Sequence, residues 1–374
     1  MSLIANRTPE QLSSNVHQVS NSKFLAVLIL LISFTATFAL WYSYTKVEER
    51  ELDSKIDTQM EQTIASISHR MQGYEEILRG GAGLFNASDD VTREEWRTYI
   101  NALQIYKHYP GIQGIGYAIR TLENEKESLS KRIHSEGYPL FSINPEGERD
   151  EYYPIIYLEP LVERNLRAFG YDMFSESVRH EAMARARDTN DMAMSGKVRL
   201  VQETNERPQA GMLIYVPVYR NNAAHNTLEE RRRNILGFVY SPFRMDDLMN
   251  GILGVRSSNI DLEIYNGTEI SNDALMYDDT SDHSNHVAGL SRERQLSIGG
   301  IIWTIKIDAL PMFTQENNKK LSSIALLVGG TLSILLAGIA WLLSNVGTRA
   351  QTLAIKMTRS RVKARERFGC FSIQ

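Results

Sequence analysis

The chain has 374 residues, of which 43% are hydrophobic and 23% charged, and this is enough for two or three folded domains. Its one cysteine, Cys370, excludes a disulfide framework, a thiol enzyme and a cysteine-ligated metal from the long middle of the chain. The net charge of −4 divides into +1 for residues 1–44, +6 for residues 321–374 and therefore −11 for residues 45–320. An acidic middle repels phosphate backbones, which argues against nucleic acid as a partner.

The first predicted element is a run of nineteen residues without a charge, from Phe24 to Tyr42. At 1.5 Å per residue such a run crosses a hydrocarbon core of about 30 Å, and aromatic residues gather at its far end, as they do at a membrane interface. We predict a transmembrane helix over 24–44 after a tail at 1–23. A buried core helix and a cleaved signal peptide are the alternatives, but the weakly charged tail and the lack of a small-residue cleavage site favour an uncleaved anchor.

Apolar residues then recur every three or four positions, a helical stripe close to the coiled-coil period. The stripe consists of Leu52, Ile56, Met60, Ile64, Ile67, Met71, Tyr74 and Leu78. We predict one stalk helix over 45–80 that ends at the glycine pair Gly80-Gly81. Such a stalk either carries a shift from a sensor to the membrane or packs on its own domain, and the two are compatible.

Between the stalk and residue 320 the pattern mixes helices and strands. Helices are predicted at 92–107, 121–136, 176–187 and 244–252. Strands are predicted at 112–119, 153–158, 197–202, 211–219, 235–241, 260–265 and 296–307. Thr92 with Glu95 three residues later is a capping box, and Gly299-Gly300 divides the last strand into a hairpin. Because the late strands follow one another without a helix in every gap, we predict an antiparallel sheet with helices packed on it.

A second uncharged run covers 321–343, where we predict a second transmembrane helix. Small residues recur there at every fourth position, namely Ala325, Gly329, Ser333 and Ala337, as in helices that pair in lipid; the alternative is that transmembrane helices are simply rich in small residues. Seven Lys and Arg follow the run and two precede it, so the positive-inside rule places 344–374 in the cytoplasm. Two spans return the N-terminus to the cytoplasm and leave 45–320 outside.

Several blocks in the middle of the chain share a likeness to one family. They are YPGIQGIGYAIR at 109–120, EYYPIIYLEP at 151–160, FGYDMFSESVRHEAMARARDTNDMAMSGKVRLVQE at 169–203 and GMLIYVPVY at 211–219. Together they resemble the CHASE domain, the extracytoplasmic sensor of bacterial receptor kinases and cyclic-dinucleotide enzymes and of plant cytokinin receptors. The resemblance is firm over 80–245 and loose over 245–310, and the two flanking spans match the family's usual setting.

The resemblance implies an α+β fold: a long stalk helix plus two PAS-like α/β subdomains with antiparallel sheets, flanked by two transmembrane helices. We place the membrane-distal, ligand-binding subdomain at 81–245 and the membrane-proximal subdomain at 246–320. The remaining segment, 344–374, resembles the short basic signalling helix that leads into a cytoplasmic kinase or cyclase in related receptors. No such domain follows it here, so we expect either a truncated receptor or a stand-alone sensor that acts on a separate cytoplasmic kinase or cyclase.

The resemblance also implies which residues contact a small-molecule ligand. In the plant receptors an aspartate before a Met-x-Ser-Glu-like stretch hydrogen-bonds the adenine of the hormone, and Asp172 takes that place here. The family's pocket-lining segments point to Met194, Leu200, Thr204, Leu213 and Tyr215. An apolar pocket with a carboxylate and a hydroxyl buries a ring and orients it. The alternatives are a helix cap for Asp172 and plain core packing for the two leucines, and the inserted NERPQ at 205–209 favours a ligand other than cytokinin.

A reading of a different class rests on an acid-rich loop that contains Asp278, Asp279, Asp282, His283 and His286. Two histidines three residues apart can share a metal on a helix, which would make the chain a surface-anchored metal-dependent enzyme; a solvated turn is the alternative. A third reading is a membrane adaptor with no ligand. We predict the sensor, with no catalytic residue, metal or cofactor. It would lie in the inner (plasma) membrane with 45–320 in the periplasm and would form a homodimer through the stalk and the second span.

Overall fold

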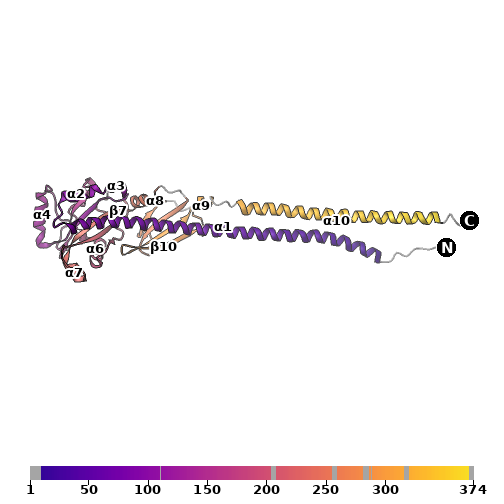
Figure 1. Cartoon of the computed structure of the whole chain (residues 1–374), viewed down its shortest axis with the longest axis horizontal. Coiled ribbons are helices and arrows are strands. Elements are labelled where there is room, and N and C mark those ends of the chain that lie inside the picture. Colours follow the sequence, from indigo (N-terminus) through magenta and orange to yellow (C-terminus); the bar gives the residue numbers. More distant parts are fainter. Residues whose placement is uncertain are drawn as a thin grey trace. The chain divides into compact units, whose positions relative to one another are not determined.

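The computed structural model describes residues 10–109, 111–203, 208–254, 259–280, 286–287, 289–315 and 320–369 (Figure 1). The chain divides into two compact units, Met1–Leu52 with Gln315–Gln374, and Asp53–Thr314. Two helices, α1 (Glu10–Ala87) and α10 (Lys320–Gly369), contain segments long and apolar enough to cross a membrane. They contain the two predicted apolar runs.

In the first unit, α1 and α10 contact each other through small residues. A Cβ built on Gly329 of α10 would overlap the Thr37 side chain on α1, and Ser333, one turn further along, is 1% exposed. Only a glycine lets the two backbones approach this closely. The predicted small-residue stripe therefore has, at Gly329, a partner within the same chain, and pairing of two copies through it stays a prediction.

In the second unit, the apolar stripe of α1 packs on its own domain. Of the seven predicted stripe residues in this unit, six are at most 1% exposed, and Ile64 is half-buried. The Tyr74 ring lies 4.9 Å from the Phe243 ring, centroid to centroid, and the Phe85 ring stacks on Tyr117 at 4.0 Å. The stalk is thus an amphipathic helix whose apolar face covers a sheet.

The predicted end of the stalk at Gly80-Gly81 is wrong, because α1 continues to Ala87. A glycine inside a helix costs about 1 kcal/mol relative to alanine, but contacts with the rest of the domain offset that cost here. A Cβ on Gly81 would lie 3.1 Å from Val239 Cγ1 and 3.4 Å from the Trp96 ring. The glycine therefore allows close packing.

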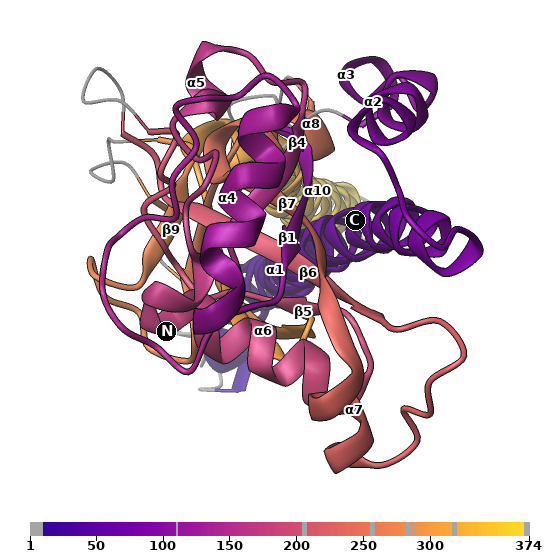
Figure 2. The ribbon, with the colours of Figure 1, turned by 90° about the vertical axis from the view of Figure 1, so that its left-hand side faces the viewer.

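The larger sheet is antiparallel and has the strand order β4-β1-β7-β6-β5. Its strands are β1 (Ile115–Ile119), β4 (Ile155–Glu159), β5 (Ala193–Met194), β6 (Gly211–Tyr219) and β7 (Ile235–Arg244). Counted along the chain, this is the order 2-1-5-4-3 of a PAS fold, as the predicted PAS-like subdomain requires. Figure 2 shows α1 and α2 (Arg93–Ala102) on one side of these strands and α6 (Ser177–Thr189) on the other.

Two local predictions around this sheet differ from the structure. The capping box of Thr92 and Glu95 is present, but the helix predicted over 92–107 breaks at Gln104, whose φ is 47°. The strand predicted at 197–202 is wrong, because the strand lies earlier, at 193–194, and 195–203 is irregular. The other elements here are α3 (Ile105–His108), β2 (Thr121–Leu122), η1 (Glu123–Glu125), α4 (Lys126–Ser135), β3 (Glu151–Tyr152), α5 (Glu163–Leu166), η2 (Met173–Ser175) and α7 (Leu228–Asn234).

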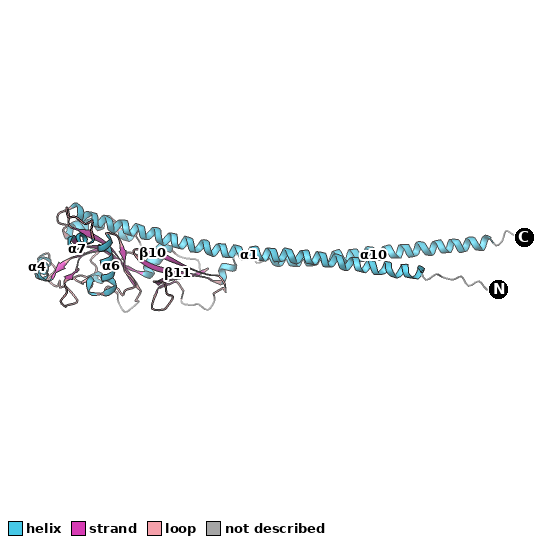
Figure 3. Ribbon diagram, turned by 90° about the horizontal axis from the view of Figure 1, so that it is seen from below, coloured by secondary structure: helices cyan, strands magenta, loops and turns pink. Residues whose placement is uncertain are grey.

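The smaller sheet is antiparallel with the order β10-β11-β8-β9. Its strands are β8 (Ile260–Asn266), β9 (Leu275–Asp278), β10 (Ser291–Ile298) and β11 (Ile301–Ala309), and the helices α8 (Met245–Leu253) and α9 (Pro311–Gln315) flank it in sequence. The predicted hairpin is confirmed: Gly299 and Gly300 form its turn with φ of 54° and 76°. Figure 3 shows both sheets alongside α1. The predicted fold class, helices with antiparallel sheets and a long N-terminal helix, is confirmed.

Candidate functional site

The candidate site lies in the core between α6 and the larger sheet. Tyr215 of β6 and Tyr240 of β7 are paired in register, so both side chains point to the same face of the sheet. Gly116 of β1 is the next partner of Tyr240, and a Cβ there would come within 2.5 Å of the Tyr240 ring. The absence of a side chain at Gly116 therefore leaves room for this ring.

The structure brings most of the predicted ligand contacts together in this region. Leu200, Leu213 and Tyr215 are at most 3% exposed and belong to one hydrophobic core with residues of α6. Met194 is fully buried and pairs with Ile214 in the sheet. Thr204 lies outside the described residues. The two leucines therefore have the core-packing role weighed as an alternative, and their contact with a ligand stays a prediction.

Asp172 is fully buried and uses its two carboxylate oxygens differently. Oδ1 accepts the backbone N–H groups of Tyr153 at 2.7 Å and Phe174 at 3.1 Å, so it caps η2, as the alternative reading proposed. Oδ2 has no hydrogen-bond partner in the described part of the chain and lies 3.4 Å from Nε of Arg149. Burial raises the pKa of Asp172, against the effect of the two backbone N–H groups and of Arg149. Oδ1 therefore has a structural role, and Oδ2 has only the ion pair with Arg149 among the described residues.

Two tyrosine hydroxyls in the same core, those of Tyr215 and Tyr240, have no hydrogen-bond partner among the described residues. Both residues are fully buried, and their ring centroids are 6.3 Å apart. Burial raises the pKa of both phenols, so each stays a neutral group that can donate. An unpaired buried hydroxyl costs about 1–3 kcal/mol.

The residues missed by sequence reasoning are Tyr240 and Arg179. Arg179 is 4% exposed, ion-pairs with Glu176 at 3.1 Å and donates to the Arg199 carbonyl at 2.8 Å. Its charge opposes the rise in pKa of Tyr215 and Tyr240, so it acts on both hydroxyls. The continuous apolar and aromatic run of this strand, which is buried from Gly237 to Phe243, indicates Tyr240 as a core residue, but only the strand register places it beside Tyr215.

A turn of the smaller sheet contacts this region. The Met194 N–H donates to the Gly299 carbonyl at 2.8 Å, and Arg185 of α6 donates to the Met194 carbonyl at 2.7 Å. A Cβ on Gly299 would overlap the Met194 side chain. Further along β10, Arg292 binds Asp57 at 2.7 Å and Asp53 at 3.0 Å on α1. The β10–β11 hairpin thus connects the candidate site to the stalk.

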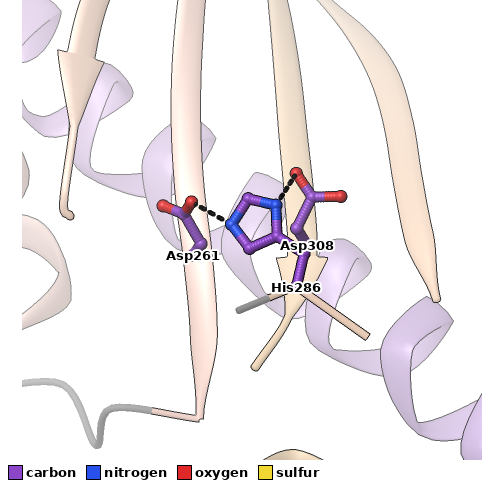
Figure 4. A group of neighbouring side chains, drawn as sticks. All are labelled: Asp261, His286 and Asp308. Atoms are coloured by element: carbon purple, nitrogen blue, oxygen red, sulfur yellow. Dashed lines mark hydrogen bonds and ion pairs between the residues drawn. The ribbon is translucent and has the colours of Figure 1, made fainter. Parts of the chain in front are cut away.

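The charged cluster of the smaller sheet is a second candidate site (Figure 4). His286 Nε2 lies 2.7 Å from Asp261 Oδ2, and its Nδ1 lies 3.7 Å from Asp308 Oδ2. Oxygen and imidazole ligands in this arrangement suit a divalent cation. Lys306, however, lies 2.7 Å from both Asp308 and Glu263, and its positive charge opposes binding of a cation.

Part of the predicted acid-rich loop adjoins this cluster. Asp278 and Asp279 can each bring a carboxylate oxygen within 4.8 Å of one from Asp261, whereas Asp282 and His283 lie outside the described residues. The loop prediction missed Asp261 and Asp308, because both lie on strands distant from the loop in sequence.

These features define a class: a membrane-anchored sensor domain of α+β fold between two apolar helices. The CHASE domain model matches residues 89–277, just over half of the 374 residues, and the chain belongs to the CHASE domain family. Family and helices together describe a membrane protein with an extracytoplasmic sensor domain rather than a catalytic one.

Two curated proteins are similar to the chain. Histidine kinase 3 of Arabidopsis thaliana is 24% identical over 186 residues, 45% of this chain and 17% of that protein. Hybrid signal transduction histidine kinase A of Dictyostelium discoideum is 24% identical over 215 residues, 52% of this chain and 10% of that protein. The chain thus spans less than a fifth of the length of either relative.

Among solved structures, the periplasmic sensory domain of the Campylobacter jejuni chemoreceptor Tlp1 aligns over 74% of this chain and 99% of its own, with 12% identity and a TM-score of 0.39.

Proposed function

We propose that this chain binds a small molecule between α6 and the larger sheet and transmits the binding event across the membrane. Both termini would lie in the cytoplasm, where a kinase or cyclase would receive the signal. The histidine kinases among its relatives support an output of this kind, and the chain itself would act as sensor.

The observation that carries the proposal is a set of three buried polar atoms: Asp172 Oδ2 and the hydroxyls of Tyr215 and Tyr240. None has a hydrogen-bond partner among the described residues, although buried polar groups in native proteins are nearly always paired. A ligand that supplies these partners would recover the desolvation cost of each group. The surrounding apolar side chains would bury its remaining surface.

Ligand entry requires side chains to move, because the proposed site is filled by its own residues. Leu200 packs so closely on β6 that a Cβ on Gly211 would lie 2.5 Å from its Cγ. Leu200 belongs to the irregular segment 195–203, which is joined to β6 through a bridge between Val198 and Gly211 and through Ser195. This segment has no regular secondary structure and is not part of a continuous strand ladder with β6, so we expect it to open.

A shift of this wall would reach the stalk through the β10–β11 hairpin. Met194, directly before the segment, forms a backbone hydrogen bond with Gly299. Arg292 of the same hairpin forms an ion pair with Asp57 of α1. A ligand moves this assembly only if it binds one arrangement better than the other. The hairpin therefore supplies a physical connection, and the difference in affinity supplies the energy.

We also propose that two copies of the chain form a dimer, but not through the apolar stripe of α1. The apolar stripe of α1 is buried in its own domain, so it is not free to form a coiled coil. A dimer would use the exposed polar face of α1 or the outer faces of the apolar helices.

A thermal-shift screen of the full chain in lipid nanodiscs tests ligand binding, with purines, amino acids and short peptides as the library. A ligand at about 100 times its dissociation constant adds roughly 2.7 kcal/mol to stability. We expect a hit to lose much of its shift in Tyr215→Phe. The control is Tyr219→Phe, which removes a hydroxyl that is already paired, with the Arg187 carbonyl. If no compound raises the melting temperature, or if the shift is the same in Tyr215→Phe as in wild type, the chain is better described as a membrane adaptor with no ligand.

The cluster of Asp261, His286 and Asp308 supports the alternative of a metal-dependent enzyme. Metal analysis of the purified full chain separates the two functions. Stoichiometric zinc or manganese that is lost in His286→Gln would favour the enzyme, and metal-free protein that still binds a library compound would favour the sensor.

A further inference from the structure

We propose that Arg149 is the resident counter-ion of Asp172, and that the ligand carries a cationic nitrogen group that takes the place of Arg149. This inference rests on the proposed function and adds to it the chemical class of the ligand and the residue with which that ligand competes.

The contact between the two residues is of a kind that can be exchanged. Arg149 Nε lies 3.4 Å from Asp172 Oδ2, whereas charge-assisted hydrogen bonds measure about 2.7–2.9 Å and the strongest arginine–carboxylate pairs are bidentate. The other carboxylate oxygen is held by two backbone N–H groups. Loss of Arg149 would therefore leave the carboxylate in place with one oxygen available.

The other end of the guanidinium is bonded to its own loop. Nη2 donates to the Pro145 carbonyl at 2.9 Å and Nη1 to the Gly147 carbonyl at 3.3 Å. This loop lines a cleft of about 560 Å³ that also touches α4 at Lys126 and Ser130. Arg149 itself does not line the cleft, but its guanidinium joins two residues that do, Pro145 and Gly147, to the buried carboxylate of Asp172.

Arg149 and Asp172 differ in burial, and this difference favours a positive charge on the ligand group that replaces Arg149. The Arg149 side chain is 21% exposed, and that of Asp172 is 0% exposed. On exchange the guanidinium can turn to water, but the carboxylate cannot, and a buried charge left without a partner is strongly destabilising. A neutral ligand would leave Asp172 without the charge of Arg149, whereas an ammonium or amidinium group would replace that charge.

A chemical-rescue experiment tests the exchange without knowledge of the natural ligand. Full-length wild-type, Arg149→Ala and Arg149→Gln proteins in nanodiscs are titrated with methylguanidinium, and the thermal midpoint is followed by tryptophan fluorescence. We expect a saturable rise in both variants, and at least tenfold more probe needed in the wild type, where Arg149 competes. The neutral N-methylurea should have no effect.

Two controls make the result specific to Asp172. Arg120→Ala removes a guanidinium of similar exposure, paired with Glu151 at 2.6 Å, and should gain no rescue. Asp172→Asn in the Arg149→Ala background keeps an acceptor for the two backbone N–H groups and should abolish rescue. Equal response of wild type and Arg149→Ala, rescue that survives Asp172→Asn, or rescue by N-methylurea would overturn the inference.

The test is separable from the test of the proposed function. Rescue in Arg149→Ala without any hit in the library would support the exchange and count against the sensor. Library hits that bind Arg149→Ala no better than wild type would support the sensor and count against the exchange.

Discussion

The two sheets of the sensor unit share an antiparallel architecture but treat their polar groups in opposite ways. All nine residues of β6 in the larger sheet are buried, and the hydroxyls of Tyr215 on β6 and Tyr240 on the neighbouring β7 have no hydrogen-bond partner among the described residues. In the smaller sheet, β10 is half-buried or exposed along its length, and its charged neighbours form ion pairs. Buried hydroxyls without partners suit the larger sheet to binding, whereas paired charges suit the smaller sheet to holding elements together.

The largest expected effect concerns the turn that joins the two sheets. In Gly299→Ala, an alanine would have to adopt the left-handed backbone conformation of Gly299, and its Cβ would overlap Met194. The backbone strain and the steric overlap together cost about 2–5 kcal/mol. Gly267→Ala is the matched control, because Gly267 also has a positive φ, of 90°, but open space at its Cβ. Urea unfolding of the full chain should show a loss of about 1–2 kcal/mol for the control. Equal losses of stability in the two variants would contradict a close contact between the Gly299 turn and Met194.

The next largest effect is a change in the free energy of unfolding that has opposite signs in different Tyr→Phe variants. Tyr215→Phe and Tyr240→Phe each remove an unpaired buried hydroxyl, so both should raise the free energy of unfolding by roughly 1 kcal/mol in the absence of ligand. Tyr219→Phe should lower it by about 1 kcal/mol, because this hydroxyl donates to the Arg187 carbonyl at 2.6 Å. Chemical denaturation measures all three. A loss of stability in Tyr215→Phe would indicate a partner for that hydroxyl and weaken the case for a binding site.

A smaller effect on stability is expected from the ion pair that joins the β10–β11 hairpin to the stalk. Arg292 is 21% and Asp57 47% exposed at the side chain, so solvent screens their pair, and such pairs contribute about 0.2–1 kcal/mol. A double-mutant cycle with Arg292→Gln and Asp57→Asn should give a coupling energy in that range. Added salt should reduce it. A coupling energy of zero at low salt would remove this contact from the proposed route.

The smallest effect is a change in pH dependence at Asp172. Its folded pKa is raised above 3.8 by burial, so between 3.8 and that raised value the folded state keeps a proton that the unfolded chain has lost. Its contribution is fully present below 3.8 and is lost as pH rises through the folded pKa. Asp172→Asn lacks this loss, so its stability relative to wild type should improve with rising pH. Parallel stability–pH curves would contradict the raised pKa.

Sequence patterns predicted the features that depend on local periodicity. The apolar stripe of α1 and the Gly299-Gly300 hairpin are periodic or punctuated signals, and both are present. The strand at 197–202 failed, because its alternation reflects packing of Leu200 on the sheet, with only a bridge at Val198. Tertiary packing also carried α1 across Gly81, which local propensity alone would not allow.

The site was only partly predictable for the same reason. The family resemblance indicated Asp172 and Tyr215, but the pairing of Tyr215 with Tyr240 depends on strand register. The approach of Arg149 to Asp172 depends on a loop that lies 23 positions earlier in the chain. Contacts between distant segments carry no local sequence signal, so a single sequence cannot reveal them.

Hydrogen exchange on the full chain in nanodiscs tests whether ligand binding at the larger sheet reaches the stalk. The protein would be compared with and without the compound that gives the largest thermal shift. We predict slower exchange in two places, at the site around 211–215 and in the hairpin turn around 298–301. Protection confined to the site, with an unchanged turn, would contradict the claim that binding between α6 and the larger sheet reaches the stalk.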